Sequence, residues 1–253
     1  MKKHIFLIIS ILTLGATTVF AENADTKFQK ANELYKANKY TESASLYQEI
    51  LASGLASTEL YYNLGNAQYR NGNFAQAILN YERALRLSPS DNDVKHNLAL
   101  AKTKTTDNIN ATPKFFLSRW LTNINHWFSA NCWGAICIIL VVLVCTAIGF
   151  FFLSKSYRIR KIGFFSGIVL ACFLVASIVN AVVSNNWQNS HDEAIITTPA
   201  VSIKSSPDDS AAEKYILHEG TKLFIKDLVG DWAKIELEDG NTGWINSADY
   251  EVI

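Results

Sequence analysis

The stretch YYNLGNAQYRNGNFAQAILNYERALRLSP, residues 61–89, decides the fold of the N-terminal part of this chain. Small residues stand where two paired helices would cross closely, and aromatic residues would fill the space beside them: Gly65 and Ala77, then Tyr61, Phe74 and Tyr81. Part of the pattern recurs about 34 residues upstream, where Tyr47-Gln48-Glu49-Ile50-Leu51 corresponds to Tyr81-Glu82-Arg83-Ala84-Leu85. The sequence therefore predicts an α-helical solenoid built from repeated helix pairs.

These positions resemble the signature of the tetratricopeptide repeat, and the copy at residues 61–89 matches it best. The segment from Asp91 to Lys102 predicts the first helix of a third unit or a capping helix, because its apolar residues fall on one helical face. We expect the repeat domain to occupy residues 22–112. Its last part, from Thr103 to Thr112, is expected to be a polar linker.

In such a stack the first helix of each pair lines a concave groove, which suits a peptide or a helix of a partner protein. Asparagine can bind an extended peptide backbone, because its side chain has both donors and an acceptor. The family's carboxylate clamp is not expected, since Phe28, Asp93 and Asn97 stand where that clamp has basic residues. The alternative is that the polar groove residues only cap or hydrate helices. Our partner-binding candidates are Asn32, Asn63, Asn66, Tyr69 and Arg70.

The N-terminal segment has the three-part form of a secretory signal. Two lysines are followed by an uncharged apolar run and by a small residue at Ala21. We expect a signal peptide at residues 1–21, cleaved after Ala21; the alternative is an uncleaved anchor. In either case the following residues would lie outside the cytoplasm.

Two long apolar runs predict membrane-spanning helices at residues 131–154 and 162–184, each long enough to cross about 30 Å of hydrocarbon. The loop between them, residues 155–161, is expected to be cytoplasmic, because it carries four basic residues and no acidic one. Both flanking domains would then be periplasmic in a multi-pass protein of a bacterial inner membrane. The runs contain no ionisable Asp, Glu, Lys, Arg or His, which argues against transport.

An aromatic stretch at residues 113–130 precedes the first run. Its large apolar residues recur at a spacing of three or four: Phe116, Trp120, Ile124 and Trp127. We interpret it as an amphipathic helix in the membrane interface, where tryptophan is enriched. The alternative is a helix that docks onto the repeat domain.

The tail, residues 185–253, changes to short β-type runs separated by turn signals. Leu217-His218-Glu219-Gly220-Thr221, Gly230-Asp231-Trp232 and Gly243-Trp244-Ile245 resemble the bacterial SH3-like fold, which implies a small all-β barrel. Trp232 and Trp244 are candidates for an exposed ligand shelf, or they plug the barrel; both interpretations stay open.

Charge and motif content exclude several classes of function. Residues 22–112 carry ten acidic and ten basic side chains, and residues 184–253 carry thirteen acidic and five basic, a net charge of −8, so nucleic-acid binding is not expected. We find no catalytic motif, metal-ligand cluster or cofactor signature, and we expect no enzyme. His191-Asp192-Glu193 is interpreted as a solvated turn beside the membrane, and His218 as a hydrogen-bonding residue of a turn.

The order of these modules resembles the BatE family of the Bacteroides aerotolerance operon. The resemblance covers nearly the whole chain and is carried by strings such as Tyr62-Asn63-Leu64-Gly65-Asn66-Ala67 and His96-Asn97-Leu98. It implies a non-enzymatic scaffold in an envelope stress complex with von Willebrand A-domain membrane proteins and a MoxR-type ATPase system. The alternatives are a sensor of cell wall or peptide and, third, an accessory subunit of a murein hydrolase, with peptidoglycan or a peptide as ligand.

Overall fold

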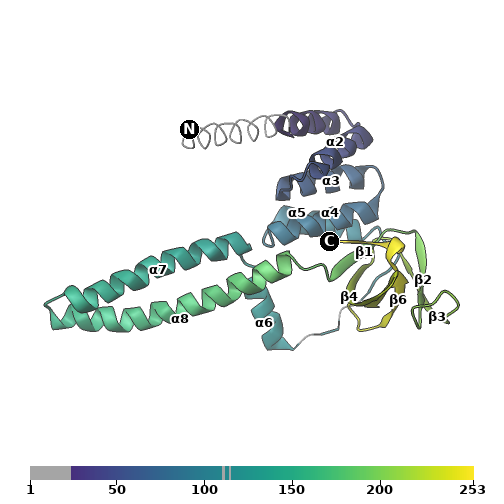
Figure 1. Cartoon of the computed structure of the whole chain (residues 1–253). Coiled ribbons are helices and arrows are strands. Elements are labelled where there is room, and N and C mark those ends of the chain that lie inside the picture. The colour runs from purple at the N-terminus through teal and green to yellow at the C-terminus, as the bar shows by residue number, and fades with distance from the viewer. Residues whose placement is uncertain (1–23, 110–111, 114) are drawn as a thin grey trace, which may run out of the picture.

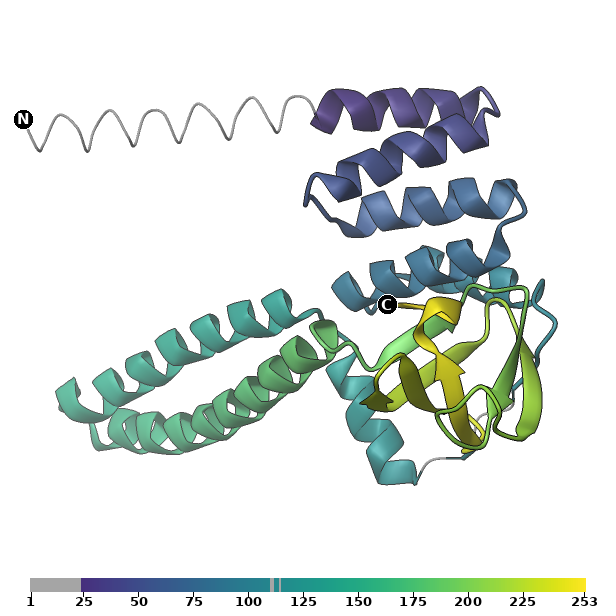
Figure 2. The same ribbon diagram turned by 45° about the vertical axis from the view of Figure 1, so that its right-hand side comes forward.

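The computed structural model describes residues 24–109, 112–113 and 115–253. The signal peptide predicted at residues 1–21 lies outside the described residues. Within them, the chain forms a stack of helices, a hairpin of two long apolar helices and an antiparallel sheet (Figure 1). The stack and the sheet lie together at one end of the hairpin in both views (Figures 1 and 2).

The helical stack follows the predicted repeat pattern. Residues 24–36 are helical, and the next elements are α2 (Tyr40–Ala52), α3 (Thr58–Arg70), α4 (Phe74–Leu87) and α5 (Asn92–Lys102). The hydroxyl of Ser57 caps α3, and the carboxylate of Asp91 caps α5, as short polar side chains do at helix N-termini. The turns within the two repeats have left-handed backbone at equivalent places, Asn38 (φ 61°) and Gly72 (φ 82°).

The closest helix crossing is at Gly65, where the repeat pattern predicts a small residue. A Cβ atom on this glycine would lie 2.6 Å from Cε1 of Tyr81. Glycine therefore lets α3 and α4 approach until the tyrosine ring fills the space between them. Tyr81 is fully buried in a cluster with Ile78, Leu79 and Val94.

The apolar hairpin consists of α7 (Ala130–Leu153) and α8 (Tyr157–Gln188), which pack along each other. By length and composition alone, these two described helices could each cross a bilayer. α8 is longer than the predicted span at residues 162–184. The predicted basic loop is mostly its first turn, so Arg158, Arg160 and Lys161 are helical.

A short helix, α6 (Phe116–Asn125), precedes the hairpin. It ends before Trp127, so the aromatic stretch at residues 113–130 is not one helix, and this prediction needs correction. His126 ends the helix, and Ser129 caps the next one with its hydroxyl. The chain therefore turns sharply between α6 and α7.

The C-terminal part is a seven-stranded antiparallel sheet of order β3-β2-β6-β5-β4-β1-β7. Its elements are β1 (Glu193–Ile196), β2 (Ala200–Lys204), β3 (Glu213–His218), β4 (Lys222–Val229), β5 (Trp232–Glu236), β6 (Thr242–Asn246), the 3-10 turn η1 (Ser247–Asp249) and β7 (Tyr250–Val252). β3 and β7 are its two edges, so the pairing of the described strands does not close the sheet. Alternate residues face its core, as in β5, where Ala233 and Ile235 are buried between exposed or half-buried neighbours.

The segment predicted as a polar linker is instead bound to this sheet. The Asp107 carboxylate accepts hydrogen bonds from the backbone N–H of His218 and from the Thr221 hydroxyl, both over distances below 3 Å. Ile109 packs against the sheet core. The N–H of Thr112 donates to the carbonyl of Glu238 (2.9 Å). The residues after α5 therefore hold the stack and the sheet together.

Candidate functional site: the repeat groove and the domain junction

Asn32, Asn63 and Asn66, together with Asn97, form two hydrogen-bonded pairs, each between the first helices of successive repeat units. Oδ1 of Asn32 accepts from the Tyr47 hydroxyl (2.6 Å) and from Nδ2 of Asn63 (3.3 Å). One repeat later, Oδ1 of Asn66 accepts from the Tyr81 hydroxyl (2.7 Å) and from Nδ2 of Asn97 (2.8 Å). The second pair therefore reproduces the first at the equivalent positions.

Each asparagine pair keeps part of its hydrogen-bonding capacity free. Among the described residues, the side-chain NH2 groups of Asn32 and Asn66 have no hydrogen-bond partner. The side-chain oxygens of Asn63 and Asn97 have none either. All four side chains are partly exposed. Each pair thus leaves at least one donor and one acceptor available, which can pair with the acceptor and the donor of a peptide unit.

The tyrosines behind the pairs keep the asparagines in this orientation. Burial raises the pKa of Tyr47 and the pKa of Tyr81, so both hydroxyls stay protonated and donate at neutral pH. Because each hydroxyl occupies one lone pair of an asparagine oxygen, the amide cannot rotate without losing that bond. The groove is therefore preorganised.

Tyr69 and Arg70 border the second pair. A groove pocket of about 170 Å³ is lined by both side chains together with Asn66, Asn97, Tyr35, Tyr81 and Leu100. The Arg70 guanidinium stacks on the ring of Tyr40, 4.8 Å from its centroid, while its side chain stays exposed. The structure thus brings Asn66, Tyr69 and Arg70 together in one pocket, whereas Asn32 and Asn63 do not line it.

The opposite side of the stack carries a charged network that sequence reasoning missed. Glu82 of α4 accepts from Lys102 (2.9 Å) and from Lys222 of β4 (3.0 Å). Lys222 also pairs with Glu193 (3.1 Å), which in turn pairs with Arg86 (3.3 Å). We call these five residues the junction network. It joins α4 and α5 to β1 and β4.

The network corrects the interpretation of His191-Asp192-Glu193 as a solvated turn for Glu193 only, because His191 and Asp192 are exposed between α8 and β1. Glu193 is the first residue of β1, and its side chain is 12% exposed. The next residue but one, Ile195, is fully buried in the core of the repeat stack, so β1 belongs to both parts. No local signal could have shown this, since Glu82 and Lys222 are 140 residues apart.

Electrostatics fix the protonation of the network. Burial would raise the pKa of Glu82, but Lys222 and Lys102 outweigh it and lower that pKa to about 2. Burial would lower the pKa of Lys222, but Glu82 and Glu193 outweigh it and raise that pKa. Glu82 and Lys222 are therefore both charged at neutral pH.

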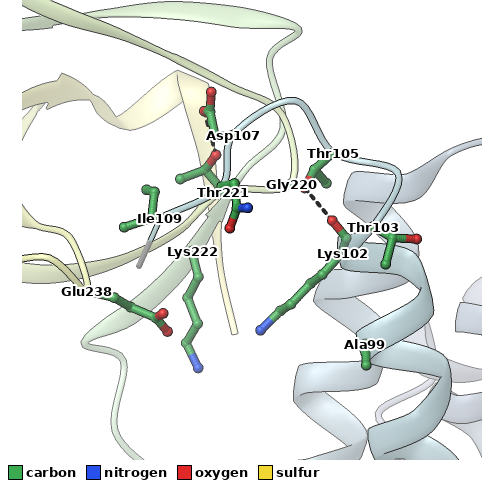
Figure 3. A pocket seen from close by; sticks show the side chains of 11 residues that line it. Ala99, Lys102, Thr103, Thr105, Asp107, Ile109, Gly220, Thr221, Lys222 and Glu238 are labelled. Carbon is green, nitrogen blue, oxygen red and sulfur yellow. Dashed lines mark hydrogen bonds between the residues drawn. The ribbon is translucent and has the colours of Figure 1, made fainter. Parts of the chain in front are cut away.

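A cleft of about 510 Å³ lies above the network, between α5, the segment after it and the sheet. Figure 3 shows the side chains of Lys102 and Lys222 entering it from the stack and from the sheet. Thr221 and Asp107 close one side through their hydrogen bond. Because both lysines are paired with Glu82, the cleft is a seam between two domains and offers no free cation pair to a ligand.

The tryptophans of the sheet lie on its outer face. In the β5–β6 pair, Trp232 is opposite Asn246 and Trp244 is opposite Lys234, whereas the core residues Ala233 and Ile245 alternate with them. Both rings are half-buried. They are not part of the sheet core, so neither ring plugs it.

His218, predicted as a hydrogen-bonding turn residue, ends β3, and its Nδ1 lies 2.8 Å from the Asp107 carboxylate. Burial would raise the pKa of Asp107, but the hydrogen bonds from His218 and Thr221 lower it. The histidine therefore helps to fasten the segment after α5 to the sheet.

The comparison with known proteins agrees with the helical stack. Residues 28–92 match the family model of the tetratricopeptide repeat. A search of curated proteins found no match. The chain therefore contains tetratricopeptide repeats in the part that forms the groove, and this indicates a scaffold for protein–protein interaction.

Proposed function

We propose that this chain is a non-enzymatic scaffold that holds an extended segment of a partner protein in its repeat groove. This proposal rests on the hydrogen-bond donors and acceptors that each asparagine pair leaves unused. The two pairs are Asn32 with Asn63 and Asn66 with Asn97. The backbone of an extended peptide in the groove can bond to a donor and an acceptor of each asparagine pair, whatever side chains the peptide carries. The pocket beside Arg70 then selects among side chains.

We further propose that the hairpin anchors the scaffold in a bacterial inner membrane. The apolar length of α7 and α8 supports this, and so does the cluster of basic residues at the turn between them, which positive-inside placement assigns to the cytoplasm. The stack and the sheet, both at the other end of the hairpin, are then periplasmic. A partner segment would belong to a neighbouring membrane protein.

The module order supports a more specific proposal, a place in a Bat-type aerotolerance complex. Its partners would be von Willebrand A-domain membrane proteins and the MoxR-type ATPase system. The C-terminal sheet would serve as the SH3-like module of this family. The strings Gly230-Asp231-Trp232 and Gly243-Trp244-Ile245 are the features that favour this assignment.

Site-specific photocrosslinking in cells tests the groove. A photoreactive residue at Leu100, which lines the groove pocket and is 43% exposed, should crosslink to a von Willebrand A-domain membrane protein. Leu228 on the sheet, 62% exposed, is the matched control and should not. The crosslink should weaken when Asn66 is also replaced by alanine. Equal crosslinking from both sites, or an undiminished crosslink without Asn66, would refute the proposed groove binding.

The outer face of the sheet favours a second candidate, recognition of cell-wall glycan or peptide by Trp232 and Trp244. Half-buried aromatic rings on an open face can stack on sugars or side chains. Co-sedimentation with purified murein would be reduced by Trp244→Ala if this face binds wall. Zymography on the same murein separates simple binding from a role beside a hydrolase.

A further inference from the structure

The helix α6 has a continuous apolar arc. At about 100° per residue, its five large apolar side chains share one arc of about 140°, and the polar ones occupy the remainder. The apolar residues are Phe116, Leu117, Trp120, Leu121 and Ile124. This division is the pattern of a helix lying between water and an apolar phase.

Four of the five residues of this arc are exposed in the described chain, and only Ile124, beside the hairpin, is half-buried. Phe116 is 72% exposed, Trp120 is 57% exposed and Leu121 is 55% exposed. The flanking aromatics Phe115 and Trp127 are exposed as well. A helix docked onto the repeat domain would bury these residues, so the structure speaks against that alternative. A contiguous apolar surface of this kind marks an interaction site.

The other end of α6 is fastened to the hairpin. Asn125 is buried, and its Nδ2 donates to the backbone carbonyl of Asn180 in α8 (2.9 Å). Its own carbonyl accepts from Nε1 of Trp133 in α7 (3.2 Å). One asparagine thus bridges both hairpin helices and fixes where α6 leaves them.

The position of α6 relates its arc to the hairpin. Figures 1 and 2 both show α6 running across the end of the hairpin rather than along it. This is the end opposite the basic first turn of α8. The 24 residues of α7 separate the two ends by about 36 Å, which is close to the hydrocarbon thickness of a bilayer plus part of its interfaces.

We propose that α6 lies in the outer headgroup layer of the membrane, with its apolar arc against the acyl chains, and sets the depth at which the hairpin carries the repeat domain. This rests on the proposed membrane insertion of α7 and α8. The occupant of the arc is lipid, because α6 is fastened at Asn125 to a hairpin whose own apolar side chains are exposed along its length. Tryptophan favours this layer.

Paramagnetic lipids measure the depth directly. The full chain, labelled with 5-fluorotryptophan, is reconstituted into phosphatidylcholine nanodiscs, and Trp120→Phe and Trp127→Phe variants assign two of the fluorine signals. Lipid with a nitroxide at acyl carbon 5 should remove most of the Trp120 and Trp127 signal intensity, and a nitroxide at carbon 16 should remove less. Trp232 and Trp244 on the sheet should keep their intensity in both.

Trp133 of the hairpin separates the two proposals. In one outcome, either lipid broadens the Trp133 signal while Trp120 keeps its intensity as Trp232 does. The hairpin is then inserted but α6 is not at the interface, so the inference about α6 is wrong and the membrane anchor stands. If Trp133 is untouched as well, the membrane anchor itself is refuted. A stronger effect of the carbon-16 nitroxide on Trp120 would also overturn an interfacial position.

Discussion

The two faces of the repeat stack use polar side chains in opposite ways. In the groove, neutral asparagines pair with each other and with a buried tyrosine, and each pair leaves one donor and one acceptor open. At the junction, Lys222 forms ion pairs with Glu82 and Glu193, so these charges are already neutralised within the protein. This difference agrees with the proposed function, in which the groove meets an exchangeable partner and the junction holds the two domains together.

The comparison also predicts different sensitivities. Removing one charge from the junction leaves buried charges with fewer counter-ions, whereas removing an asparagine from the groove leaves neutral groups near water. Junction variants should therefore lose stability, and groove variants should lose binding with smaller changes in stability.

The largest effect is expected for Glu82→Gln. It leaves the side chain of Lys222, 15% exposed, with only Glu193 as a counter-ion, and should cost about 3 to 5 kcal/mol of unfolding free energy. Denaturant unfolding of the detergent-solubilised chain measures this. Glu49→Gln, which removes an exposed pair with Lys27, is the control and should change stability by less than about 1 kcal/mol. Similar losses in both variants would mean that the junction is not special.

The junction should also weaken in acid. Because the pKa of Glu82 falls from 4.5 to about 2 on folding, its contribution is complete above pH 4.5 and disappears as the pH falls to about 2. This shift corresponds to about 3 kcal/mol. The difference in stability between the native chain and Glu82→Gln should therefore shrink across that range. A constant difference from pH 5 to pH 2 would contradict the assignment.

Gly65→Ala tests the packing beneath the groove. Its Cβ would meet the ring of Tyr81 at 2.6 Å, so we expect a loss of about 1 to 3 kcal/mol from overpacking. The shifted ring would also weaken the bond from Tyr81 to Asn66. Gly134→Ala, where a Cβ would meet nothing within 4 Å, is the matched control. Melting temperatures of the two variants give the comparison.

The smallest stability effects are expected in the groove itself. Asn66→Ala removes the acceptor shared by Tyr81 and Asn97 and should cost about 1 to 2 kcal/mol. Asn63→Ala leaves Asn32 bonded to Tyr47 and should cost less than about 1 kcal/mol. Both should weaken partner crosslinking from Leu100. Full crosslinking in both variants would show that the asparagines serve only the fold.

Local pattern was sufficient for the elements and insufficient for their contacts. The repeat spacing predicted α3 and α4, and the alternation of Ala233 and Ile235 predicted β5, because periodicity within a segment reflects the face it buries. β1 was not predicted as a strand, because its four residues are too few to show an alternating pattern directly after a long helix. The attachment of Asp107 to the sheet also depends on residues more than a hundred positions away.

The groove was predicted in part. Position within the repeat placed Asn32 and Asn66 on equivalent sites, since both are ninth in their units. Their partners, the hydroxyls of Tyr47 and Tyr81, lie on the following helix, and only the helix crossing brings them together. Hence the orientation of each amide, and with it the open donor and acceptor, required the folded chain.

The short connection between α8 and β1 limits how the molecule can move. Only residues 189–192 separate the two elements, and within them the carbonyl of Ser190 accepts from Arg86 of α4. The ring of Trp187 lies under the same guanidinium. Rotation of the stack and the sheet relative to the hairpin would first have to break these contacts of Arg86 with Ser190 and Trp187. If the groove binds a partner as proposed, these contacts would fix the orientation of the groove relative to the hairpin, and force on the partner would be transmitted to α8.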